Sequence, residues 1–151
     1  MAKEVVVIRM SLNVAALGVV LGLWLSGTHI LAHHAFTAEF DATKPVTVRG
    51  IVTKVEWINP HSWIHVDVKE PDGEVVNWAF ELGAPNALFR RGWRKDSIGP
   101  GIEVVITGFR GKSGRPIANG RTIKFADGRE LFAGSSGTGA PLDGADPTER
   151  R

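Results

Sequence analysis

The sequence predicts a small all-β domain with one short helix, built as an OB-fold, a five-stranded Greek-key barrel. Hydrophobic residues alternate along five segments between residues 46 and 132, and Gly, Pro and Asp residues separate those segments. One helix-like segment lies between the third and the fourth. The order of three strands, a helix and two strands is typical of an OB-fold. A small β-sandwich is the alternative, although sandwiches normally have about seven strands.

The first expected strand covers residues 46–58, which are rich in β-branched side chains. Its hydrophobic residues follow one parity as far as Val52 and the other parity from Val55 onward. Because successive side chains of a strand point to opposite faces, this change of parity predicts a bulge or bend between Gly50 and Lys54.

The next two strands form the expected hairpin, joined by the turn Pro71-Asp72-Gly73. Residues 63–68 and 74–82 alternate in the period of a strand with one buried face. The expected core side consists of Ile64, Val66, Val68, Val76, Trp78, Phe80 and Leu82. The expected outer side, which the two strands share if they pair, consists of His61, Trp63, His65, Asp67, Asn77, Ala79 and Glu81.

The helix is expected within residues 83–92, because Pro85 suits a first helical turn and Gly92 can end a helix. The last two strands are expected at residues 102–109 and 117–125, before a short segment at residues 130–132. A single core should then contain Gly50, Val52, Val66, Trp78, Phe80 and Ile106.

Residues 1–32 have the order of a secretory signal peptide, with Lys3 and Arg9 before an uncharged apolar run. That run, residues 11–25, is shorter than the about 20 residues that span a bilayer, which favours cleavage over a retained anchor. Cleavage after Ala32 makes His33 the mature N-terminus. The mature protein is expected in the periplasm or secreted, without stable membrane insertion.

Two segments flank the expected domain at residues 46–132. Residues 33–45 are expected to form an extended N-terminal arm, in which Phe36 and Phe40 share a face that packs on the barrel. Residues 133–151 contain almost nothing hydrophobic and are expected to be a disordered tail.

The composition excludes several classes of function. Without cysteine there is no disulfide, thiol chemistry or cysteine-ligated zinc. Removal of Lys3, Glu4 and Arg9 with the signal lowers the formal charge from +2 to +1, so a surface for nucleic acid is not expected. No triad spacing, phosphate loop, zinc-protease motif or paired carboxylates indicate catalysis, which favours a binding protein over an enzyme.

The candidate metal ligands are histidines. A processed His33 offers its α-amine and its imidazole to one ion, a nitrogen set that suits copper, and His34 or His61 can add a further ligand. Within one strand, His61 and His65 would lie about 13 Å apart, so at most one of them belongs to a single-ion site. The alternative is a solvated N-terminus that binds no metal.

A second candidate site is the outer face around Trp63, with His65, Asn77 and Glu81. The face of strands two and three is the usual ligand surface of OB-folds, and a tryptophan there can stack on a ring or a sugar. This leaves an alternative function, a metal-free module that binds a small organic ligand, a glycan or a partner protein. Equally, Trp63 can simply cover the flank of the barrel.

A set of short motifs runs through the sequence: His33-His34-Ala35-Phe36, Phe40-Asp41, Lys44-Pro45-Val46, Val55-Glu56-Trp57, Asn59-Pro60-His61, Asn77-Trp78, Pro85-Asn86-Ala87-Leu88, Arg91-Gly92-Trp93, Gly108 and Ala126-Asp127-Gly128-Arg129. Together these motifs resemble a bacterial family of small exported proteins known as a domain of unknown function, DUF6152, over residues 33–137. The double histidine and the Asn-Pro-His turn belong to the family pattern, which favours the metal interpretation. The resemblance implies no activity.

Overall fold

The structure is a computed structural model that describes residues 36–134. The expected signal peptide, His33, His34 and the tail from residue 135 lie outside the described residues. The labelled elements are β1 (Phe40–Glu56), β2 (Trp63–Lys69), β3 (Val75–Glu81), α3 (Pro85–Arg90), β4 (Glu103–Gly111), β5 (Ile117–Phe125) and β6 (Glu130–Phe132). Within the described part, no helix has the length and hydrophobicity to cross a membrane.

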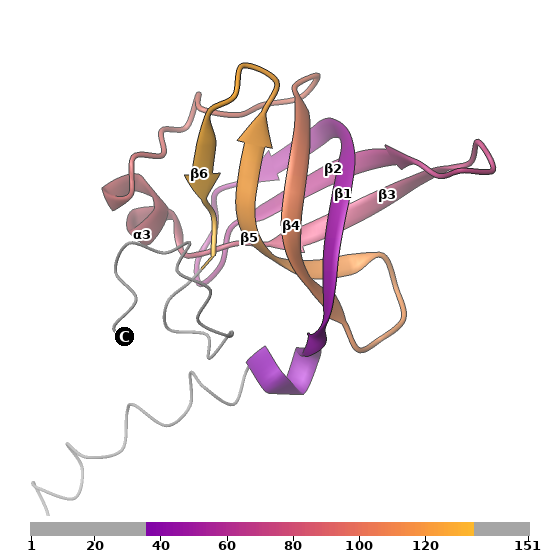
Figure 1. Ribbon diagram of the computed structural model, residues 1–151. Helices are drawn as coiled ribbons and strands as arrows, with labels where there is room; N and C mark the ends of the chain where they lie inside the picture. The colour runs from indigo at the N-terminus through magenta and orange to yellow at the C-terminus, as the bar shows by residue number, and fades with distance from the viewer. Residues whose placement is uncertain (1–35, 135–151) are drawn as a thin grey trace, which may run out of the picture. The chain divides into compact units, whose positions relative to one another are not determined.

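The strands form one sheet that closes on itself (Figure 1). Neighbouring strands follow the order β3-β2-β1-β4-β5-β6, and a further pairing of β3 with β5 completes a ring of β1, β2, β3, β5 and β4. The β3–β5 pairing is parallel and the others are antiparallel. The prediction of an all-β fold with one short helix is confirmed. The strands thus form one continuous sheet of six strands and not the two separate sheets of a sandwich.

β1 is long because it serves two parts of the ring. Its residues up to Ile51 pair with β4, and those from Ile51 onward pair with β2. The register shifts between Val52 and Lys54, which leaves Thr53 as the extra residue of a bulge. The bulge lets Val52 and Val55 both face the core although they are three residues apart, as the change of parity predicted.

β1 begins at Phe40, six residues before the predicted start, and residues 36–39 are helical where an extended arm was expected. Phe36 and Phe40 are both buried, with ring centroids 5.6 Å apart, and Phe36 meets Phe109 edge-on at 5.7 Å. Residues four apart share a face in a helix as well as in a strand. The spacing therefore predicted the packing but not the conformation.

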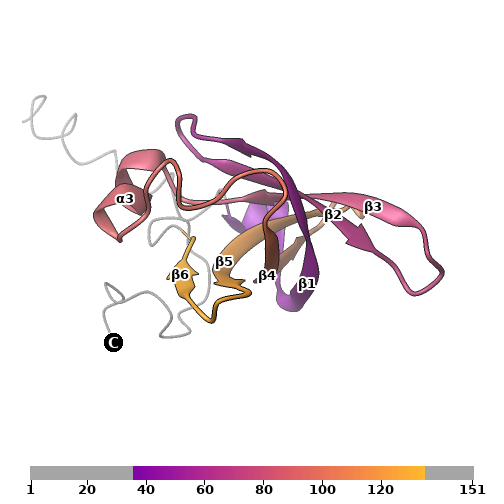
Figure 2. The ribbon, with the colours of Figure 1, turned by 90° about the horizontal axis from the view of Figure 1, so that it is seen from above.

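One core fills the ring, and all six predicted core residues, Gly50, Val52, Val66, Trp78, Phe80 and Ile106, are buried. α3 begins at Pro85, and Gly92 follows the helix at a φ of 97°, as the sequence predicted. Leu88 and Trp93 are fully buried, and the Trp93 indole donates a hydrogen bond to the Phe132 carbonyl at 2.8 Å. Seen from above, α3 lies beside β6, away from the projecting β2–β3 hairpin (Figure 2).

The fold continues two residues past the predicted end of the domain. Ala133 is fully buried; its amide donates to the Arg121 carbonyl at 2.7 Å, and its carbonyl accepts from the Gly83 amide at 2.8 Å. Gly134 also donates to Arg121. These bonds involve backbone atoms alone, so the small side chains of the segment gave no signal of them. The expected tail is therefore shorter by Ala133 and Gly134.

Candidate functional site

His61 lies in the turn before β2, next to the end of β3. Its Nδ1 is 2.9 Å from Oε1 of Glu81. The two residues meet because the antiparallel hairpin places Trp63 opposite Glu81. The Glu81 side chain is only 8% exposed, whereas that of His61 is 31% exposed. A buried carboxylate thus holds a partly accessible imidazole at the edge of the ring.

The hydrogen bond to Glu81 raises the pKa of His61, and burial of the ring opposes that effect. The charges of Glu81 and of Glu39 raise it further. Glu39 ends the helical turn that precedes β1. The start of the described chain therefore lies within electrostatic range of His61.

The second ring nitrogen of His61, Nε2, has no hydrogen-bond partner within residues 36–134. In metal sites, a carboxylate commonly accepts a hydrogen bond from one nitrogen of a ligating histidine, which fixes the ring and leaves the other nitrogen for the metal. Glu81 occupies the position of such an orienting group. The part of the chain that the structure describes does not hold a set of three or more His, Asp or Glu side chains able to bind a metal, so a site built on His61 needs ligands from elsewhere.

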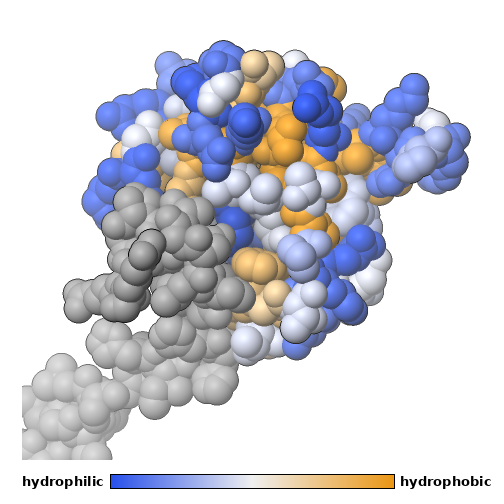
Figure 3. Space-filling view, viewed as in Figure 1, coloured by the Kyte–Doolittle hydropathy of each residue, from blue (hydrophilic) through white to orange (hydrophobic). Residues whose placement is uncertain are grey.

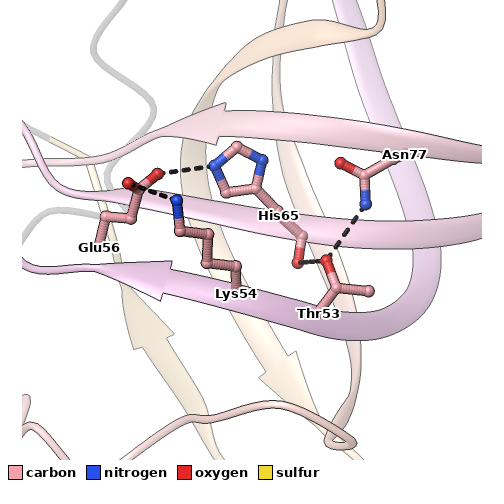
Figure 4. A network of polar contacts seen from close by, with 5 residues as sticks. All are labelled: Thr53, Lys54, Glu56, His65 and Asn77. Carbon is pink, nitrogen blue, oxygen red and sulfur yellow. Dashed lines mark hydrogen bonds and ion pairs between the residues drawn. The ribbon is translucent and has the colours of Figure 1, made fainter.

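His65 belongs to a separate polar network on the outer face (Figure 4). Its Nε2 is 2.9 Å from Oε2 of Glu56, whose Oε1 is 2.7 Å from Nζ of Lys54. The hydroxyl of Thr53 donates to the His65 carbonyl at 3.2 Å and accepts from Nδ2 of Asn77 at 3.2 Å. The network therefore starts at the bulge and links β1, β2 and β3.

His61 and His65 pair with different carboxylates, and no contact joins the two histidines within the described residues. Asn77 also donates to Oδ1 of Asp67 at 2.7 Å. The hydrogen bond from Lys54, followed by that from His65, lowers the pKa of Glu56. Because this carboxylate is exposed to solvent, the network is a set of surface contacts that links neighbouring strands.

Trp63 is half-buried and lines a cavity of about 390 Å³. The other walls come from the turn before β1, with Glu39 and Phe40, and from the connection between β4 and β5. These two segments lie together at the lower end of the sheet in Figure 1. The Lys112 amide donates to the Glu39 carbonyl at 2.8 Å, and Lys112 Nζ donates to the Thr37 carbonyl at 2.6 Å. Trp63 therefore lines a cavity with defined walls, in addition to covering the flank of the ring.

The face shown in Figure 1 has hydrophobic surface over β1 and β4, bordered by hydrophilic residues (Figure 3). The large hydrophobic residues that are exposed within residues 36–134 are Ile51, Ile58 and Val75, which come from β1, the turn after it and β3. Hydrophobic residues scattered in this way are normal on a protein surface.

Sequence reasoning placed Glu81 on the outer face but missed its burial and its pairing with His61. It also passed over Glu39, Lys112 and Arg115, which line the cavity. A signal for Glu81 exists in the hairpin register, which sets it opposite Trp63. Lys112 and Arg115 carry no such signal, because their connection reaches the turn before β1 only through the long-range pairing of β1 with β4, which sets Phe40 opposite Gly111.

Residues 22–120 match the model of a family of unknown function, DUF6152. The chain belongs to the DUF6152 family. The resemblance to this family that was drawn from the motifs is thereby confirmed for the motifs up to residue 120. In this DUF6152 protein the match spans both candidate sites, from His33 and His34 through His61 and Glu81 to Ile117. Neither a curated protein nor a solved structure matches the chain.

Proposed function

We propose that this DUF6152 protein is an exported, non-enzymatic binding protein that holds one copper ion with His61 and the processed N-terminus. The observation that carries the proposal is the His61–Glu81 pair. Glu81 is buried and fixes the imidazole through Nδ1 at 2.9 Å, and Nε2 has no partner within residues 36–134. An imidazole that is held in a fixed orientation and has one unbonded nitrogen is suited to coordinate a metal ion.

The anchoring of the turn before β1 supports a contribution from the N-terminal histidines. Phe36 is buried against Phe40 and Phe109, and Glu39 is within electrostatic range of His61. Consecutive Cα atoms are about 3.8 Å apart, so the Cα of His34 lies within about 8 Å of that of Phe36, and the Cα of His33 within about 11 Å. The chain before Phe36 is therefore short, and its length allows the double histidine to reach the side of the molecule that carries His61.

The donor set explains the choice of metal and the link to export. The α-amine and imidazole of His33 chelate through two nitrogens, and His34 or Nε2 of His61 adds a third, a set that suits Cu(II). The amine becomes available only when residues 1–32 are removed. Copper binding is thus a property of the processed protein, which we place in the periplasm or outside the cell.

A competition titration with a copper chelator tests the proposal. The chain that starts at His33 should bind Cu(II) at least about tenfold more tightly than the same chain acetylated at its N-terminus, because acetylation removes the α-amine from the set of ligands and leaves every side chain in place. Glu81→Ala should weaken binding by about tenfold through loss of ring orientation, and His61→Ala, which removes the ligand itself, by at least as much.

His65→Ala is the matched control. His65 is also a partly exposed histidine paired with a glutamate at 2.9 Å, but it lies in the other network, so its loss should leave copper affinity unchanged. Circular dichroism of each variant verifies that it is folded. Equal affinity of the processed chain with a free α-amine and of the acetylated chain would refute the proposed copper site.

A further inference from the structure

We propose that the cavity beside Trp63 binds a small ring-bearing carboxylate, either an aromatic acid or an acidic sugar, without the help of a metal. This site goes beyond the proposed copper function and does not depend on it. Its parts are an aromatic platform, two cations on one connection and a single carboxylate on the neighbouring turn before β1.

Trp63 supplies a rigid platform. It is the first residue of β2, paired with Glu56 of β1 on one side and with Glu81 of β3 on the other. Phe40 and Ile117 add hydrophobic walls to the same cavity of about 390 Å³, a size within the range of about 300–1,000 Å³ that is common for small-molecule sites. A tryptophan held by two strands loses little freedom when a ring stacks on it.

The connection between β4 and β5 brings Lys112 and Arg115 to the cavity. Both ends of the connection are anchored: Lys112 binds the carbonyl groups of Thr37 and Glu39, and the carbonyl of Pro116 accepts from the Ala79 amide at 3.0 Å. Arg115 is exposed and has no ion-pair partner within residues 36–134. Its guanidinium is therefore available to bind a carboxylate through two parallel hydrogen bonds.

Glu39 narrows the class of ligand. It is the one acidic residue among the described residues that line the cavity. Its negative charge opposes a dianion such as phosphate, whereas its oxygens accept hydrogen bonds from a hydroxyl group. A ring with one carboxylate that binds Arg115 and one hydroxyl group that donates to Glu39 fits both side chains.

Binding is tested on the mature chain in the presence of a metal chelator, by NMR chemical shifts and Trp fluorescence. The two probes are 4-hydroxybenzoate for an aromatic acid and glucuronate for an acidic sugar, and their uncharged counterparts are phenol and glucose. At least one carboxylate should bind at least about tenfold more tightly than its counterpart, and inorganic phosphate should bind more weakly than that carboxylate. The probe that binds shows whether the cavity takes an aromatic acid or an acidic sugar.

Variants assign the binding to the cavity. Arg115→Gln should weaken it by about tenfold or more, the loss expected for hydrogen bonds to a charged group, and Trp63→Leu should abolish the fluorescence response. Arg129→Gln is the matched control, because Arg129 is an exposed arginine in the turn before β6 that pairs with Asp127 at 2.7 Å. His61→Ala should leave the carboxylate affinity unchanged, which separates this result from the copper test. Carboxylates that bind no better than phenol and glucose, or equal losses in Arg115→Gln and Arg129→Gln, would overturn the proposal.

Discussion

Replacement of Gly50 by alanine tests the closed ring directly. Gly50 is buried where β1 passes from its pairing with β4 to its pairing with β2: it is opposite Val104, and the next residue, Ile51, is opposite Asp67. A Cβ on Gly50 would overlap the backbone oxygen of Asp67 and lie 2.6 Å from Cγ1 of Val66. A backbone oxygen cannot rotate away as a flexible side chain can, so β1 and β2 must separate locally.

The expected loss follows from two opposing effects. Overpacking of a core costs about 1–3 kcal/mol, and alanine recovers about 0.4–1 kcal/mol by restricting the unfolded chain. The free energy of unfolding of Gly50→Ala should therefore fall by about 1–2 kcal/mol. For a domain of this size that lowers Tm by at least about 4 °C. Urea denaturation followed by far-UV circular dichroism, together with a thermal scan, measures both quantities.

Gly99→Ala is the matched control. A Cβ on Gly99 meets nothing within 4 Å, and the residue does not have the positive φ that favours glycine. Its free energy of unfolding should stay within about 0.5 kcal/mol of the wild type. If Gly50→Ala is as stable as Gly99→Ala, the close approach of β1 and β2 at this point is wrong.

Two other predictions concern pH and the end of the fold. In metal-free protein the free energy of unfolding should fall as pH rises from about 6.5 through the raised folded-state pKa of His61, because Glu81 and Glu39 make the folded protein hold that proton more tightly than the unfolded chain does. Urea denaturation at pH 6 and pH 8.5 measures this, and an undiminished pH dependence in His61→Gln would contradict it. A chain that ends at Gly134 should keep its Tm within about 2 °C, whereas one that ends at Phe132 should lose about 1–3 kcal/mol with the backbone hydrogen bonds of the last two residues. Equal thermal midpoints for the two truncations would show that those bonds add nothing.

Much of the fold could be predicted from the sequence because it depends on local alternation. The parity of Val52 and Val55 located the bulge, and the alternation of residues 63–68 and 74–82 set the hairpin that forms the outer face. Pro85 and Gly92 located the helix for stereochemical reasons that need no tertiary information. These features depend on steric rules that act within a few residues.

Features that depend on long-range pairing were not predictable in the same way. The start of β1 at Phe40 comes from its partner Gly111, which is 71 residues away, and alternation within residues 40–45 is weak. The burial of Ala133 depends on backbone bonds to Arg121 and Gly83. In both cases the chain carries no side-chain pattern that distinguishes a paired strand from a loop.

The candidate site lies between these two cases. The hairpin register brings His61 to Glu81, but the register alone leaves Glu81 on an outer face, where a carboxylate would be solvated. Its burial comes from ring closure, since β3 pairs in parallel with β5 and sets Glu81 opposite Asn119, which is also buried. A solvated glutamate would hold an imidazole weakly, whereas a buried one is confined to a single partner. The fixed orientation of His61 is therefore a consequence of closing the ring, which is why His61 could be named as a candidate ligand from its turn motif while the group that orients it emerged only from the fold.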